Sequence, residues 1–177
     1  MSEAESIENK AEILSIFLRK GNVFLQKGDY QSALKMANDA EDQIEELKGK
    51  KTELIGNLLK LKSLVYIKTN EFGKALKAAQ SLLMLSKKLN EIEKEIIALN
   101  VIAIVSGVKG NFKIATQYFQ EALEKSEKIG YKFYIAQCQI NIGTIYAQLH
   151  NHSDALERYN AVLENHQDIL DLSLIHI

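Results

Sequence analysis

The chain has 177 residues, of which 25% are charged, and its formal net charge is −1 at pH 7. Acidic and basic residues are interspersed, so the chain lacks the clustered Lys and Arg side chains that contacts to nucleic-acid phosphates require. Proline is absent, glycines number only nine, and good helix formers are plentiful. This composition predicts an all-α fold.

The N-terminal segment is acidic and lacks the basic and apolar regions of a signal peptide. No apolar run approaches the ~18 residues that a membrane span needs. The single Cys138 cannot form an internal disulfide, which suits a reducing compartment. We therefore expect a cytoplasmic protein that binds neither membrane nor nucleic acid through this segment.

The apolar pattern predicts eight helices along the chain. In order, they cover about 6–27, 30–48, 52–69, 71–88, 91–109, 112–128, 132–149 and 152–166. Short joins such as KGKK, LN and IG separate successive pairs of helices. With no linker between them, the pairs are expected to form a single domain.

Four segments carry the same pattern of residues: GNVFLQKGDYQSA, SLVYIKTNEFGKA, AIVSGVKGNFKIA and GTIYAQLHNHSDA. They open on the small residues Gly21, Ser63, Ala103 and Gly143, at intervals of 42, 40 and 40 residues. A turn residue follows each of them, in the order Gly28, Asn70, Gly110 and His150. An alanine comes after each turn, in the order Ala33, Ala75, Ala115 and Ala155. Recurrence at a fixed period indicates a repeat architecture.

Each of these positions has a physical role. A small residue inside a helix lets a neighbouring helix approach closely, and Gly, Asn or His at the turn tolerates the left-handed conformation that ends a helix. The residues expected to cap the following helix, or to interact with its dipole, are Asp29, Glu71, Asn111 and Ser153. The residues expected to anchor it are Tyr30, Phe72, Phe112 and His152.

The order small residue, aromatic, turn, acidic residue, aromatic and alanine resembles the tetratricopeptide repeat (TPR). GNVF…KGDYQSAL and NIGTIY…SDAL are most similar to its consensus, and the resemblance covers roughly residues 12–166. The period indicates the longer-helix variant found in kinesin light chain and in many bacterial regulatory proteins. HEAT repeats have a similar period of about 40, but these spacings favour TPR.

The TPR resemblance implies a right-handed α-solenoid of four helix-turn-helix pairs. The repeats are expected at about 12–50, 52–90, 91–130 and 131–167, within one array over residues 1–171.

Candidates for catalysis and metal binding are few. Cys138 lies among apolar neighbours, which favours a buried structural thiol over a nucleophile. His150 and His152 form an H-x-H sequence, but the repeat assigns one to the turn and the other to the anchor position. We therefore predict a protein that is not an enzyme and has no metal and no cofactor.

The resemblance implies a scaffold that binds a peptide or partner helix in a concave groove. The candidate groove residues are Leu18, Asn22, Leu25, Lys60, Leu64, Ile67, Asn100, Ile104, Asn141 and Thr144. Further first-helix positions with the same expected orientation include Ile97, Gln137 and Ile140. The alternative is that several of the apolar residues pack against adjacent helices instead.

TPR co-chaperones hold a C-terminal carboxylate with Lys, Asn and Arg side chains from three first helices. The corresponding positions here are Leu18, Asn22, Leu61, Ile97 and Val101, of which only Asn22 matches. The sequence therefore argues against a carboxylate clamp.

Two further functions stay open at this stage. The chain could be the sensory or dimerising region of a larger signalling protein with a kinase, cyclase or DNA-binding effector. A solenoid enzyme such as a regulator phosphatase would need an acid or amide cluster in the groove, and none is evident in the sequence.

The last six residues, LSLIHI, depart from the repeat pattern. They are what the mosaic-end adapter of transposase-based sequencing libraries would encode, so we expect residues 172–177 to be a non-native tail. The alternative is a native apolar tail that covers the last helix. We also expect the native protein to continue with a fifth helix pair, because a solenoid needs terminal repeats with a polar outer face. Without that pair, the last helix pair could mediate homo-oligomerisation.

Overall fold

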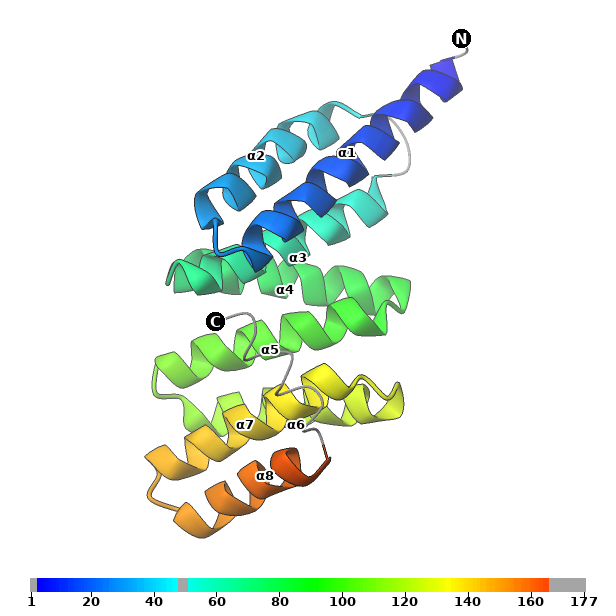
Figure 1. The fold of residues 1–177 in the computed structure, drawn as a ribbon. Coiled ribbons are helices and arrows are strands. Elements are labelled where there is room, and N and C mark those ends of the chain that lie inside the picture. The colour runs from blue at the N-terminus through cyan, green and yellow to red at the C-terminus, as the bar shows by residue number, and fades with distance from the viewer. Residues whose placement is uncertain (1–2, 48–50, 166–177) are drawn as a thin grey trace. The chain divides into compact units, whose positions relative to one another are not determined.

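The computed structural model describes residues 3–47 and 51–165, and every regular element in these two ranges is an α-helix. The helices are α1 (Glu3–Gln26), α2 (Tyr30–Glu46), α3 (Thr52–Lys68), α4 (Phe72–Leu89), α5 (Ile92–Val108), α6 (Phe112–Lys128), α7 (Lys132–Gln148) and α8 (His152–Asn165) (Figure 1). The all-α prediction and the eight predicted helices are confirmed. The largest difference is at α1, which begins at Glu3 rather than near residue 6.

The helices fall into two compact units, Met1–Lys88 and Leu89–Ile177. In the described part of the chain, no helix is long and apolar enough to cross a membrane. The repeat boundaries and the right-handed superhelix stay predictions. The expected tail at residues 172–177 lies outside the described residues.

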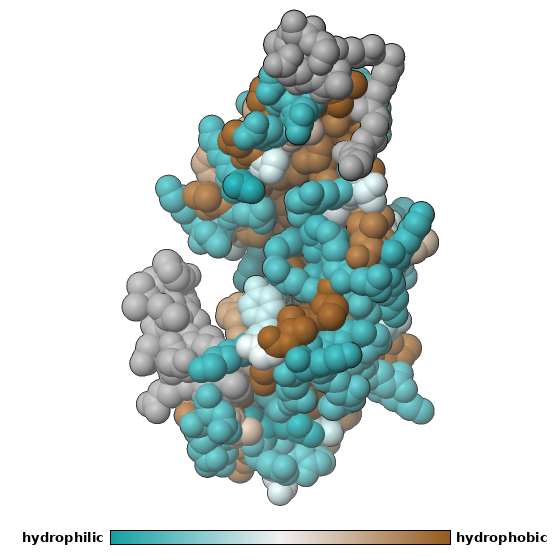
Figure 2. Space-filling model, turned by 90° about the vertical axis from the view of Figure 1, so that its right-hand side faces the viewer, coloured by the Kyte–Doolittle hydropathy of each residue, from teal (hydrophilic) through white to brown (hydrophobic). Residues whose placement is uncertain are grey.

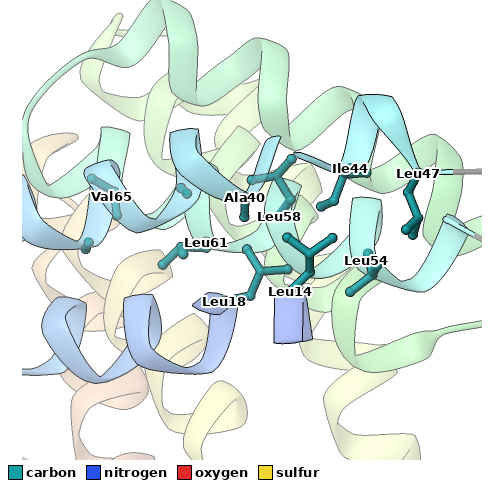
Figure 3. Close-up of a cluster of buried hydrophobic side chains, with 11 residues drawn as sticks. Leu14, Leu18, Ala40, Ile44, Leu47, Leu54, Leu58, Leu61 and Val65 are labelled. Carbon is teal, nitrogen blue, oxygen red and sulfur yellow. The ribbon is translucent and has the colours of Figure 1, made fainter. Parts of the chain in front are cut away.

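The core of the first unit joins three helices. Leu14 and Leu18 of α1 meet Ile44 of α2 and Leu58 and Leu61 of α3 in one cluster of buried side chains (Figure 3). Burying side chains of this size stabilises a fold by about 1.5–3 kcal/mol each. The cluster therefore ties the first helix of one pair to the first helix of the next.

Small residues allow the helices to come this close. A Cβ added to Gly21 would lie 2.5 Å from Cδ2 of Leu61, and one added to Gly143 would lie 2.8 Å from Cε1 of Tyr159. Ser63 and Ala103, at the same repeat position, are fully buried. The predicted close-approach role of this position is confirmed.

The turns inside the four pairs share one backbone geometry. The predicted turn residues have positive φ angles: 76° at Gly28, 59° at Asn70, 77° at Gly110 and 60° at His150. In each turn the next backbone N–H donates to a carbonyl five residues earlier: Asp29 to Phe24, Glu71 to Tyr66, Asn111 to Ser106 and Asn151 to Tyr146. This pattern closes the end of a helix and confirms the predicted left-handed turns.

The predicted caps are confirmed only in part. Asp29 accepts a hydrogen bond from the backbone N–H of Ser32 at 3.0 Å, and the hydrogen bonds from Ser32 lower the pKa of its carboxyl group. Asn111 stands at the N-cap position without a side-chain capping bond. Ser153 is not the cap, because α8 begins at His152 and Oδ1 of the preceding Asn151 accepts a hydrogen bond from the N–H of Asp154.

We predict that Gly21→Val lowers the free energy of unfolding by about 1–3 kcal/mol, because the new side chain overlaps Leu61 in a packed core. Urea denaturation followed by circular dichroism measures this change. Gly73→Val is the matched control, since nothing lies within 4 Å of a Cβ at Gly73 in α4. Equal stability of the two variants would contradict the close-approach role of Gly21.

Candidate peptide-binding surfaces

In the second unit, three amide side chains form a cluster between the first helices of successive pairs. Asn100 of α5 donates from Nδ2 to Oε1 of Gln137 on α7 at 2.6 Å. One turn along α7, Nδ2 of Asn141 lies 3.5 Å from Oδ1 of Asn100. Asn100 is only 5% exposed, whereas Gln137 and Asn141 are half-buried. We call Asn100, Gln137 and Asn141 the amide cluster.

Apolar and hydroxyl side chains continue from the amide cluster along both helices. Ile104 is half-buried one turn after Asn100, and Thr144 is exposed three residues after Asn141. The Thr144 hydroxyl donates to the carbonyl of Ile140 at 2.9 Å and lies 3.3 Å from the hydroxyl of Tyr159 on α8. Four of the predicted site residues thus lie on two helices that contact one another.

The other six predicted site residues lie in the first unit, on α1 and α3. Asn22, Leu25, Lys60, Leu64 and Ile67 are half-buried. Asn22 donates from Nδ2 to the carbonyl of Leu18 in its own helix at 2.9 Å. Leu25 packs against the core of the unit.

Leu18 requires a correction. Its side chain is only 1% exposed, within the core cluster of α1, α2 and α3. It is therefore not accessible to a ligand. Residues in the i, i+4 relation share a helix face, but the packed neighbouring helices decide which of them water can reach.

The carboxylate-clamp positions are unsuited to an anion. Leu18, Leu61, Ile97 and Val101 are all at most 2% exposed, so four of the five positions hold buried apolar side chains. Burying a carboxylate among such groups without donors is strongly unfavourable. This agrees with the expectation from the sequence.

Cys138 has the environment of a structural cysteine. It is a free thiol buried on α7, and burial, with a smaller contribution from Glu127, raises its pKa to about 12. A thiol with this pKa stays protonated at neutral pH and is a poor nucleophile.

The two histidines of the H-x-H sequence lie at the turn before α8. His150 has the left-handed conformation of the turn, and the ring centroids of His150 and His152 are 6.1 Å apart. His152 is exposed, so it does not form the anchor that was predicted for it. Across residues 3–47 and 51–165, no group of three or more His, Cys, Asp or Glu side chains is placed to hold a metal ion.

An aromatic group at the start of α7 was not predicted from the sequence. Tyr134 lies edge-on to both Tyr131 and Phe133, with centroid distances of 5.0 and 5.1 Å. Burial raises the pKa of Tyr134, whereas Phe133 is 47% exposed. The signal was the short sequence YKFY, which brings three aromatic side chains to one turn.

Comparisons with known proteins support the repeat and the helical fold. Residues 94–168 match the family model described as tetratricopeptide repeat. This part of the chain therefore carries tetratricopeptide repeats. No curated protein matches the chain. Repeats of this family generally mediate protein–protein interaction, and their fold is typically a non-catalytic scaffold.

The crystal structure of BtubC (BKLC) from P. vanneervenii has a similar fold. The TM-score is 0.69 at 18% sequence identity, over 95% of this chain and 75% of that one. The likeness supports the TPR-like succession of packed helices that the sequence predicts.

We predict that Cys138 of the folded protein reacts slowly with iodoacetamide at pH 8, because its pKa of about 12 leaves little thiolate. Mass spectrometry should find rapid labelling only after unfolding in urea. The control variant Cys138→Ser with Met84→Cys carries its thiol at a position that is 73% exposed and should react quickly while folded. Rapid labelling of Cys138 in the folded chain would count against a buried thiol.

Proposed function

We propose that the chain is an interaction scaffold whose first helices bind an extended peptide or a partner helix. The observation that carries the proposal is the amide cluster of Asn100, Gln137 and Asn141, which lies beside Ile104. An amide side chain offers both donors and an acceptor, so it can hydrogen-bond a peptide backbone irrespective of the ligand's sequence. Neighbouring apolar side chains supply area to bury against the ligand.

The hydrogen bonds within the amide cluster also support this proposal. Asn100 is nearly buried and is bonded to Gln137 at 2.6 Å, so part of the cluster is already ordered without a ligand. A pre-ordered side chain loses less conformational entropy when a ligand binds. In this proposal Asn100 is a positioning residue, and Gln137 and Asn141 contact the ligand.

The first unit contributes a second candidate surface on α1 and α3, with Asn22, Leu25, Lys60, Leu64 and Ile67. The proposal includes a cytoplasmic location. The alternative of a sensory region in a larger signalling protein stays a prediction, which the sequence of the intact gene would test.

We predict that Asn141→Ala weakens binding of peptides selected against the wild-type chain by about 2- to 12-fold, the equivalent of one hydrogen bond of about 0.5–1.5 kcal/mol. Peptides would be selected from a displayed random library and measured by fluorescence polarisation. Asn160→Ala, which changes an exposed Asn on α8, is the matched control and should leave affinity unchanged.

Nuclear magnetic resonance provides an independent readout of the same binding event. Chemical-shift changes should concentrate on α5 and α7, around the amide cluster. Changes confined to α6 and α8, or equal affinity for wild type and Asn141→Ala, would reject this surface.

A further inference from the structure

Hydrophobic side chains interrupt the hydrophilic surface of the molecule in several places, as the face in Figure 2 illustrates. Two sets of them lie on the first and last described helices. Ile13, Ile16 and Val23 on α1 and Leu156 and Leu163 on α8 are each between 48% and 59% exposed. Isolated exposed apolar residues are common on protein surfaces. These residues are unusual because their counterparts in other repeats are buried.

On α1, the exposed residues occupy repeat positions that are buried in the other first helices. Ile16 corresponds to Leu58, Ala98 and Cys138, and Val23 corresponds to Val65, Val105 and Ile145. All six of these counterparts are at most 4% exposed. The side of α1 that carries Ile16 and Val23 is therefore a packing surface that no described helix covers.

On α8, too, an exposed residue occupies a repeat position that is buried in an earlier helix. Leu163 corresponds to Leu123 of α6, which is only 2% exposed in a helix that packs against α7. The packing surface of α8 for a following first helix is thus also uncovered among the described residues.

One ion pair shows that these two positions face one another within the chain. Glu41 of α2 contacts the ammonium group of Lys62 on α3, where the two helices pack together. In the repeat, Glu41 occupies the position of Leu163, and Lys62 occupies the position of Lys20. Lys20 lies on α1 between Ile16 and Val23. If α8 packed on α1 as α2 packs on α3, Leu163 would therefore lie opposite these residues.

We propose that α8 of one copy of this chain packs against α1 of a second copy, in the way that α2 packs on α3 and α6 on α7. Leu163 then meets Ile16 and Val23, and the aliphatic stem of Lys20 covers the same contact. The exposed pair Arg19 and Lys20 on α1 is opposite in charge to the exposed Glu157 and Glu164 on α8, which favours this pairing over α8 with α8.

The contact is head-to-tail, so the two surfaces differ and the association is open-ended. Each added copy buries one α8 surface and one α1 surface and leaves one of each at the ends of the assembly. The proposal concerns these end helices and does not depend on the peptide-binding proposal.

Sedimentation equilibrium on the full chain tests the association. The average mass of the wild-type chain should rise above its monomer mass of 20.0 kDa as concentration increases towards about 1 mM. Ile16→Glu and Leu163→Glu should each remain monomeric, because each removes one of the two surfaces. A wild-type chain that stays monomeric over this range would overturn the proposal.

Mixing the two variants tests the head-to-tail geometry. The Ile16→Glu chain keeps α8 and the Leu163→Glu chain keeps α1, so a mixture should form a one-to-one dimer that grows no further. If Ile16→Glu alone still dimerises, the contact is α8 to α8 and the proposal is wrong. If the mixture stays monomeric, the two surfaces do not pair and the proposal is equally wrong.

Met84→Glu is the matched control. Met84 is 73% exposed on α4, and its counterparts Asp42 and Glu124 are already acidic, so this position accepts a carboxylate. This variant should associate like the wild type. Thermal unfolding of all three variants should agree with the wild type measured at low concentration, because each change falls on an exposed side chain.

Discussion

Within each unit, the fold depends on burying the second helix of one pair against the first helix of the next. A single pair has too little apolar surface to be stable alone, so each pair relies on its neighbours. In the first unit this contact is the cluster in which Ile44 of α2 meets Leu58 of α3. In the second unit, Leu123 on α6 and Ile142 on α7 are buried side chains of helices that pack together. Nearest-neighbour contacts of this kind explain why one short pattern can recur along the chain.

The same constraint determines which sides of the helices are not covered by packing. In the second unit, α5 packs against α6, and α7 packs against α8, α6 and α5. The side on which α5 and α7 approach one another is the one that the proposed ligand would meet. The side chains on that side of α5 and α7 are polar at Asn100, Gln137 and Asn141 and apolar at Ile104 and Ile140. Among the described residues, the constraint also leaves uncovered packing surfaces on α1 and α8, where Ile16 and Leu163 are exposed. The proposed peptide binding and the proposed self-association therefore both rest on this packing rule.

Some contacts between packed helices are ion pairs rather than apolar contacts. Lys62 is nearly buried and is paired with Glu41, whereas its counterparts Ile102 and Ile142 are apolar. Glu95 is also buried and pairs with Lys125 at 2.9 Å, between α5 and α6. Each pair joins one nearly buried charge to a more exposed partner, and removing that partner would deprive the nearly buried charge of its ion pair, which is costly. Such pairs can therefore favour one register of adjacent helices over another.

The sequence by itself determined the eight helices, the left-handed turns at Gly28, Asn70, Gly110 and His150, and the close approach at Gly21. These features are local, because turn geometry and helix periodicity depend on residues only a few positions apart. Tertiary structure decided which side chains are accessible. Leu18 and Asn22 are one turn apart on the same helix, yet only Leu18 lies inside the core, because α2 and α3 cover it. Tertiary structure also brought Asn100 to Gln137, which are 37 residues apart. Periodicity predicts that side chains share a helix face, but only the packed neighbour decides whether that face is core or surface.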